Sequence, residues 1–228
     1  SCYGPEEAYL ALGAGHTHLS IFVAIATVIT VFVISASYSL IIEVFPHGGG
    51  GYLVASRLLS PSVGMVAGCA LLIDYLLTIA ISLASGTDAL FSFLPLEFHQ
   101  YKMQFCIGSL CLLTILNIRG VKESVLPLVP IFLTFILTHL VMIVYAIFTH
   151  TANVPGMISD THMEIQKTYS ELGLWGMLFL ILKAYSLGAG TYTGIEAVSN
   201  GLPILREPRV KTGKRTMVYM SFSLAFTV

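Results

Sequence analysis

Charged side chains are scarce in this sequence: only 10% of its 228 residues are Asp, Glu, Lys or Arg, whereas a soluble domain usually carries about a quarter. The formal net charge is −1, and no basic patch of binding size lies outside one short loop, so we expect no nucleic-acid partner. The four cysteines show no metal or disulfide spacing and are interpreted as small core residues. No H-E-x-x-H or G-x-S-x-G motif occurs, and we therefore expect neither an enzyme nor a resident cofactor or metal.

Long apolar runs take the place of the missing charges, since 56% of the residues are hydrophobic. Several runs reach or approach the roughly 20 residues that a membrane-spanning helix needs. The clearest are Leu19–Val44, Val63–Leu94, Met103–Ile118, Leu126–Phe148 and Leu174–Asn200. The sequence therefore predicts an all-α polytopic protein of the cell membrane, with the lipid bilayer as a partner.

The distribution of Lys and Arg indicates how the chain is oriented. If the four-glycine connection at residues 48–51 is cytoplasmic, eight basic residues lie on that side and two on the other. The eight are Arg57, Arg119, Lys122, Arg206, Arg209, Lys211, Lys214 and Arg215, and the two are Lys102 and Lys167. This asymmetry is the positive-inside pattern of membrane proteins.

Both ends of the sequence fall in helical patterns. The chain starts at Ser1 without Met and stops at Val228 inside an apolar run that begins at Met217. We expect residues 1–228 to be a single transmembrane domain and a fragment of a longer polytopic protein.

Shorter segments connect the long runs. SCYGPEEAYLAL opens a helix with proline and acidic residues in its first turn, but GAGHTHL ends it after about a dozen residues, too few to cross a membrane. FPHGGGGYLVASRLL predicts a tight glycine connection into a short amphipathic helix. Residues 150–173 are polar and aperiodic and are predicted to be a loop, as is the basic stretch REPRVKTGKR before the seventh segment.

One carboxylate lies in the middle of an apolar run, in LLIDYLLTIAIS. Asp74, Thr78, Ser82 and Ser85 fall within one helical stripe less than about 90° wide, with Tyr75 beside it. A carboxylate there is costly unless it is protonated, paired or bound to a cation. The residues leave two interpretations open: a structural Asp, paired with Lys183 or capping a broken helix, or an ion or proton site in which the hydroxyls supply further oxygen ligands.

The sixth segment carries a second carboxylate next to a predicted helix break. Three glycines in SLGAGTYTG each weaken a helix by roughly 1 kcal/mol relative to alanine, so we expect a break around Ser186–Gly190 and a new helix N-terminus near Thr191. Past it, Thr193, Glu196 and Asn200 would share one face. Unwound helices at mid-membrane build the substrate sites of many secondary transporters. With the short opening helix as a second broken segment, the pattern fits an inverted repeat of five spans.

The motifs around these residues resemble a known family. FPHGGGGYLVASRLLSPSVGMVAG resembles the second-to-third-span signature of the amino acid/polyamine/organocation (APC) permeases, and YTGIEAVSNGLPILREPRVKTGKRTM resembles their sixth span and basic loop. The sequence is particularly similar to the KimA-type potassium importers of that superfamily in YGPEE, IDYLLTIAIS, SGTDA, NIRGVKES and LKAYSLGAGTYTGIEAVSN. The resemblance covers nearly the whole chain. It implies a LeuT-like inverted-repeat fold, with residues 1–228 covering about spans 1b–7 and helices 1 and 6 broken.

The resemblance also implies a potassium pathway. Tyr3 would be the first-span tyrosine near the ion, and the other implied site residues would lie on the third span (Asp74, Tyr75, Thr78 and Ser82) and on the sixth (Thr193 and Glu196). Residues 189–192 depart from the importers' sequence.

The charge of the candidate site bears on the substrate. Two carboxylates, Asp74 and Glu196, would attract a cation and repel the α-carboxylate of an amino acid. Our hypothesis is proton-coupled potassium uptake by alternating access, with potassium and protons as transported ions. A proton-coupled amino acid permease of the same fold is the alternative, and a homodimer is left open as the assembly.

Overall fold

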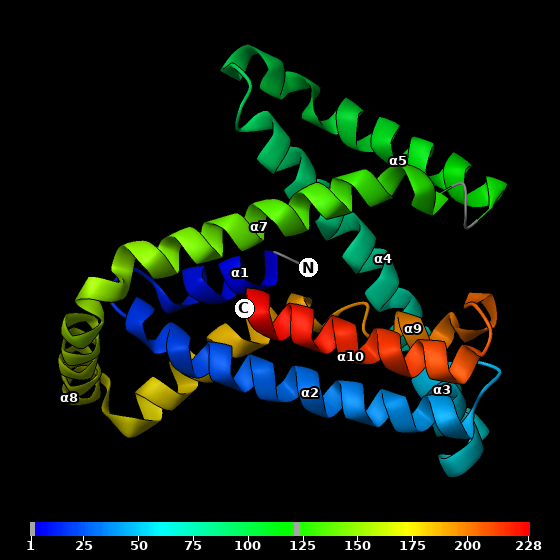
Figure 1. The fold of residues 1–228 in the computed structure, drawn as a ribbon, viewed down its shortest axis with the longest axis horizontal. Helices are drawn as coiled ribbons and strands as arrows, with labels where there is room; N and C mark the ends of the chain where they lie inside the picture. The colour runs from blue at the N-terminus through cyan, green and yellow to red at the C-terminus, as the bar shows by residue number, and fades with distance from the viewer. Residues whose placement is uncertain (1–2, 121–123) are drawn as a thin grey trace. The chain divides into compact units, whose positions relative to one another are not determined.

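The computed structural model describes residues 3–120 and 124–228, and these residues are helical almost throughout (Figure 1). The chain forms two compact units: unit 1 contains Ser1–Thr78 and Met163–Val228, and unit 2 contains Ile79–His162. The α-helices are α1 (Tyr3–Leu12), α2 (Ser20–Val44), α3 (Gly50–Val54), α4 (Pro61–Phe91), α5 (Lys102–Arg119), α7 (Val129–His150), α8 (Val154–Leu187), α9 (Ala197–Asn200) and α10 (Arg209–Thr227). Shorter helical turns are η1 (Thr17–Leu19), η2 (Ala55–Leu59), η3 (Leu96–Tyr101), η4 (Leu126–Leu128), η5 (Thr151–Asn153), η6 (Gly188–Tyr192) and η7 (Leu202–Ile204). The expectation of one transmembrane domain over residues 1–228 stays a prediction.

Among the described residues, five helical segments are long and apolar enough to cross a membrane. They are Thr17–Val44, Pro61–Phe91, Leu96–Arg119, Leu126–His150 and Val154–Asn200. Each of the five apolar runs of the sequence overlaps one of these segments, so the predicted all-α multi-pass membrane architecture is confirmed.

Local sequence sets the bounds of the first two helices. Helix α1 has Pro5 in its first turn and ends at Leu12, followed by Gly13 at φ +71°, a left-handed conformation that glycine adopts at little cost. Helix α2 ends at Val44 because Phe45 precedes Pro46, and a residue before proline is disfavoured in the α conformation. The glycine connection that follows has positive φ at Gly48, Gly49 and Gly50, as predicted for a tight turn into a short helix.

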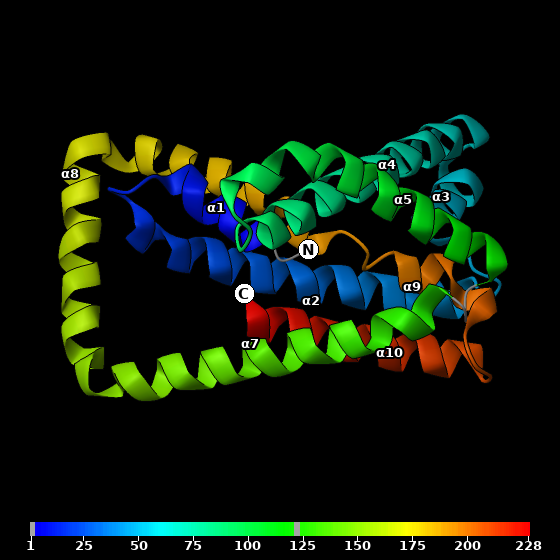
Figure 2. The same cartoon turned by 90° about the horizontal axis from the view of Figure 1, so that it is seen from above.

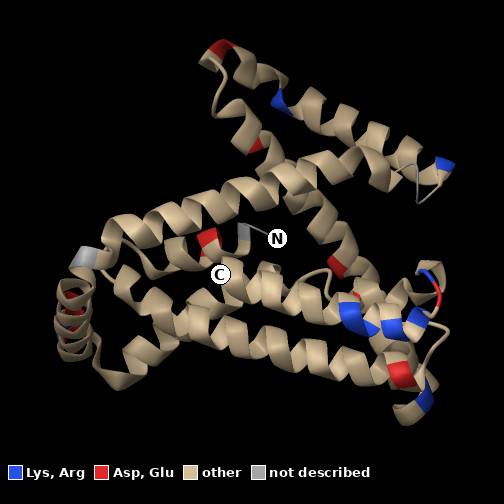
Figure 3. Cartoon of the chain, in the orientation of Figure 1, with Lys and Arg blue, Asp and Glu red and all other residues tan. Residues whose placement is uncertain are grey.

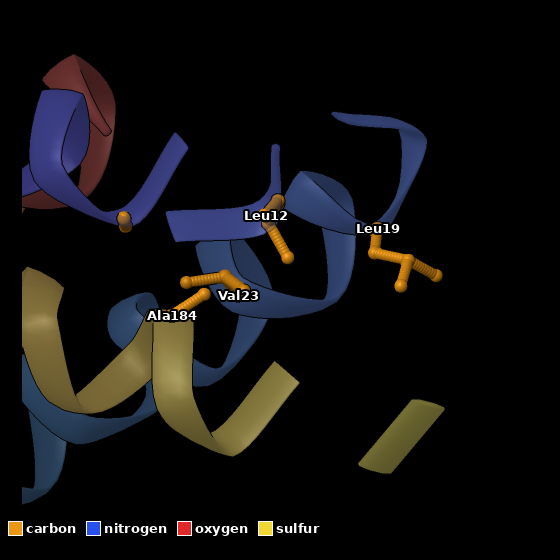
Figure 4. Close-up of a cluster of buried hydrophobic side chains, with 5 residues drawn as sticks. Leu12, Leu19, Val23 and Ala184 are labelled. Atoms are coloured by element: carbon orange, nitrogen blue, oxygen red, sulfur yellow. The ribbon is translucent and has the colours of Figure 1, made fainter. Parts of the chain in front are cut away.

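A hydrophobic cluster joins three helices of unit 1. Leu12 of α1, Leu19 of η1, Val23 of α2 and Ala184 of α8 are buried together with Ala8 (Figure 4). Polar contacts extend this packing to the first half of α8, because the hydroxyl of Thr168 is 3.2 Å from Nδ1 of His16 and 2.9 Å from Nε2 of His18. Nδ1 of His18 also lies 3.3 Å from a carboxylate oxygen of Glu164. The loop between α1 and α2 is therefore fixed to α8.

Helices α2 and α10 lie side by side in both views (Figure 1; Figure 2). The buried residues Val31 and Ile42 of α2 pack in one cluster with Met217 of α10. The serine hydroxyls of α2 and α10 meet inside this contact, with 2.6 Å between Oγ of Ser221 and Oγ of Ser35. Small residues of this kind allow membrane helices to approach closely and to hydrogen-bond across their interface.

Unit 2 has its own contacts between the end of α4 and the start of α5. Phe91 is buried, and its ring packs edge-on against Phe105 with 5.7 Å between the ring centroids. Nζ of Lys102 lies 2.5 Å from a carboxylate oxygen of the exposed residue Asp88. These contacts hold the two helices together across η3.

Two segments predicted as loops are helical, and those predictions are wrong. Residues 154–172 form the first part of α8, which is interrupted only at Gly173 (φ 67°, ψ 175°). Thr161, Ile165 and Thr168 are the more buried positions there, at helical spacing, but two of the three are threonines and the apolar pattern was therefore weak. Helix α10 begins at Arg209, so most of the basic stretch is helical too, since Lys and Arg are themselves good helix formers.

Candidate functional site

The sixth segment is broken, as the glycines predicted, but the break extends further than expected. Helix α8 ends at Leu187, the tight turn η6 follows, and Thr193 is extended (φ −62°, ψ 136°). Gly194 has φ +92°, a conformation that favours glycine. Helix α9 then begins at Ala197.

The predicted helix start near Thr191 is therefore wrong. The glycines did not unwind the chain at once, because a tighter 3₁₀ turn still accommodates them. Thr193 and Glu196 consequently lie inside the break, and they do not share a helical face with Asn200.

Glycines bring α1 and η6 into backbone contact. A side chain at Gly188 would place its Cβ 2.9 Å from Cβ of Ala8 and 3.3 Å from the carbonyl oxygen of Gly4. A Cβ at Gly4 would lie 2.9 Å from the carbonyl oxygen of Gly188. The short first helix thus packs directly on the broken part of the sixth segment.

Two tyrosines hold the broken segment against α2. The hydroxyl of Tyr192 donates to Oγ1 of Thr27 at 3.2 Å, and the hydroxyls of Tyr185 and Thr30 are 2.7 Å apart. The two tyrosine rings are adjacent, with centroids 5.9 Å apart. The sequence analysis did not predict these pairs. The one signal was that Tyr192 lies among residues 189–192, whose sequence differs from that of the potassium importers.

The two candidate residues inside the break bond to the backbone of the break itself. The backbone N–H of Gly194 donates to both carboxylate oxygens of Glu196, at 3.2 Å each. The hydroxyl of Thr193 donates to the carbonyl oxygen of Gly190 at 2.8 Å. The carboxylate of Glu196 therefore accepts a hydrogen bond from a backbone N–H group that the helix break leaves outside a regular helix.

Tyr75 connects α4 to the far side of the break. Nδ2 of Asn200 donates to the hydroxyl of Tyr75 at 2.8 Å. Asn200 is also bonded to Glu196 through the backbone, since its N–H donates to the carbonyl oxygen of Glu196 at 3.0 Å. The hydrogen bond between the side chains of Tyr75 and Asn200 thus links α4, which carries Asp74 and Tyr75, to the end of the break and to α9, which carry Glu196 and Asn200.

Three other candidate residues are less closely tied to this group. Thr78 is half-buried and lies one helical turn from Asp74 on α4. Ser82 is exposed and belongs to unit 2, beyond the boundary that crosses α4. Tyr3 begins α1, but its side chain lies outside the described residues.

Asp74 itself is half-buried. Within residues 3–120 and 124–228 it makes no hydrogen bond or ion pair, and in particular none with the exposed residue Lys183. The structural interpretation that paired Asp74 with Lys183 therefore gains no support from this arrangement.

A cavity of about 280 Å³ opens beside the break, between α1, α2 and η6. Its wall is mainly apolar and neither Asp74 nor Glu196 lines it; the lining residues with hydroxyl groups are Tyr9, Ser20, Thr27 and Thr191. Hard cations prefer oxygen ligands, and the carboxylates and hydroxyls of the break and of α4 offer such atoms outside this cavity.

Long helical spans, a broken sixth segment and half-buried carboxylates are typical of secondary membrane transporters, and comparison with known sequences agrees. The chain belongs to the amino acid permease family, whose sequence model matches residues 4–228. It is also 35% identical over 227 residues to the potassium transporter KimA of Bacillus subtilis (strain 168). The alignment covers 98% of this chain and 36% of KimA, so the chain spans about a third of the length of this relative. The resemblance to the permease superfamily is confirmed.

Proposed function

We propose that this chain belongs to a secondary active transporter that takes up potassium together with protons by alternating access. The similarity to a protein named as a potassium transporter, at 35% identity over almost the whole chain, supports potassium as the substrate. The proposal includes no enzymatic activity, no resident cofactor and no nucleic-acid partner. Its partners are the transported ions, the bilayer and, as a further prediction, a second copy of the protein.

One observation argues most strongly for a cation. In transporters with broken helices, exposed backbone N–H groups at the break point toward anionic groups of the substrate. Here the Gly194 N–H already donates to the Glu196 carboxylate, so the protein supplies its own anion at that place. A substrate carboxylate would have to displace Glu196, whereas a potassium ion would be attracted by it.

The second carboxylate, that of Asp74, is suited to carry the transported proton. Asp74 has no hydrogen-bond or ion-pair partner among the described residues, and an isolated charge inside the bilayer is costly. Such a carboxylate is stabilised by binding either a proton or a cation. Asp74, next to Tyr75 in the chain, and Glu196, one helical turn before Asn200, are linked by the hydrogen bond between Tyr75 and Asn200 and would in this way couple the two ions.

The description of the matched family gives a second candidate, a proton-coupled amino acid permease. Broken helices form both substrate and ion sites in secondary transporters. The phenol of Tyr75 argues against this second candidate, because it is hydrogen-bonded to Asn200, one helical turn from Glu196, and takes up volume that an amino acid side chain would need.

The test uses the complete reading frame that contains this chain, expressed in cells that lack their own potassium uptake systems. We expect growth at low external potassium and uptake of a rubidium tracer. Asp74→Asn, which removes one charge with little change in volume, should lower rubidium uptake at least about tenfold, equivalent to 1.4 kcal/mol or more. The matched control is Asp88→Asn, which removes an exposed carboxylate paired with Lys102, and it should leave uptake near the wild-type value.

Two results would contradict the proposal. Normal uptake in both Asp74→Asn and Glu196→Gln would show that the site assignment is wrong. An absence of rubidium uptake, together with pH-dependent uptake of labelled amino acids, would establish the amino acid permease instead.

A further inference from the structure

A second hollow lies in unit 1, away from the candidate ion site. It has a volume of about 440 Å³ and is formed by one face of α10 and the segment that leads into it. It is lined by three cations and one carboxylate, together with Pro208, two threonines and a tyrosine: Arg206, Glu207, Lys211, Thr212, Arg215, Thr216 and Tyr219. Nothing in the proposed transport mechanism uses them.

The spacing on α10 makes this surface a continuous stripe. Lys211, Arg215 and Tyr219 are four residues apart and therefore lie above one another, about 6 Å per step along the helix axis. The hydroxyls of Thr212 and Thr216 lie next to them. The opposite face carries the buried residues that pack on α2, among them Met217 and Ser221.

Among the described residues, the basic residues around the hollow are paired with carboxylates, whereas those that line it are not. Lys214 pairs with Glu43 at the end of α2, and Arg209 pairs with Glu207 at 3.0 Å. Within the described parts of the chain, Arg206, Lys211 and Arg215 have no carboxylate partner. The basic residues gather at one end of α10, next to α9 (Figure 3). The hollow therefore has an excess of uncompensated positive charge.

The ion pair with α2 indicates the depth at which the hollow lies in the membrane. The contact between Lys214 and Glu43 places this part of α10 at the end of the span Thr17–Val44. The excess of Lys and Arg puts that end on the cytoplasmic side. Tyr219 is 71% exposed and lies one turn deeper than Arg215, a suitable position for an aromatic side chain at a membrane interface.

We propose that this hollow binds the phosphate headgroup of an anionic phospholipid from the cytoplasmic leaflet. Arg206, Lys211 and Arg215 neutralise the phosphate, and the hydroxyl of Thr212 donates a hydrogen bond to one of its oxygens, whereas the hydroxyl of Thr216 donates to the carbonyl oxygen of Thr212 at 2.9 Å. Tyr219 packs against the lipid where the headgroup meets the acyl chains. Basic pockets on the cytoplasmic side of membrane helices are suited to such headgroups.

The test measures lipid retention by the complete protein, purified from membranes and mixed with phosphatidylglycerol or phosphatidylcholine in detergent. Native mass spectrometry counts the lipids that stay bound. We expect phosphatidylglycerol to be retained in preference. Each cation removed should weaken its binding about fivefold, and the triple variant Arg206→Gln/Lys211→Gln/Arg215→Gln roughly 100-fold if the contributions add.

The control variant Arg57→Gln removes an exposed cation from the same side of the chain but outside the hollow, and it should retain phosphatidylglycerol like the wild type. The charge-preserving variant Lys211→Arg/Arg215→Lys should also retain it, which separates charge from folding. Equal retention by the triple variant and the wild type would overturn the proposal. So would full displacement of the lipid by millimolar inorganic phosphate, since the site would then be one for a free anion.

Discussion

At the level of single residues, the contact between Tyr75 and Asn200 is the most informative. The sequence placed Asn200 on a helical face with Thr193 and Glu196, whereas the structure places its amide against a phenol 125 residues away. The polar side chains in apolar runs could be recognised from the sequence. Their partners could not, because those depend on how α2, α4 and α9 pack, and no periodicity within one helix encodes that packing.

This contact leads to a prediction at the same scale. Tyr75→Phe and Asn200→Ala each remove one side of the hydrogen bond, and the double variant removes both. Hydrogen bonds between membrane helices average about 0.6 kcal/mol in double-mutant cycles, so we expect a coupling free energy of about that size, measured from the unfolding of the complete protein. A coupling free energy of zero would show that the two side chains do not interact.

At the level of elements, the sequence predicted the long spans and the fact of a break, but not the extent of the break. Hydropathy and length are enough for helices such as α2 and α4. The limits of the break depend on local alternatives, a 3₁₀ turn at Gly188–Tyr192 and a positive φ at Gly194, whose free energies differ little. The first half of α8 was missed for a related reason, since its buried positions are partly threonines and its hydrophobic pattern is weak.

The contact of α1 with η6 can be tested by adding one methyl group. In Gly188→Ala the new Cβ would lie 2.9 Å from Cβ of Ala8, so α1 and η6 must separate, at a cost of about 1–3 kcal/mol. We expect a lower melting temperature and reduced rubidium uptake. Gly86→Ala is the control, because Gly86 lies within α4 with no atom in reach of an added Cβ, and alanine favours a helix there. Equal melting temperatures for the two variants would argue against close packing of α1 on η6.

At the level of the whole molecule, the described residues place both carboxylates in unit 1, on α4 and in the break after η6. A broken helix is a suitable place for a site that must open to one side of the membrane at a time, because its two halves can move separately. Family membership and the overall helical architecture were predictable, because they depend on motifs and hydropathy spread over the whole chain. Selection of the proposed ion depends on the positions of a few oxygen atoms, which neither motifs nor hydropathy encode.

The proposed proton coupling concerns the complete transporter and would have a thermodynamic signature. One pH unit of gradient supplies about 1.4 kcal/mol per proton, so transport of one proton with each potassium ion would accumulate rubidium up to about tenfold across proteoliposomes. The vesicles contain equal rubidium inside and outside, with a permeant anion to remove the membrane potential, and the outside is acidified. We expect tracer to accumulate inside, a protonophore to abolish the accumulation, and Asp74→Asn to lose it. Tracer exchange that is equally fast with and without the pH gradient, and never exceeds equilibrium, would show that protons do not drive the uptake and that Asp74 has another role.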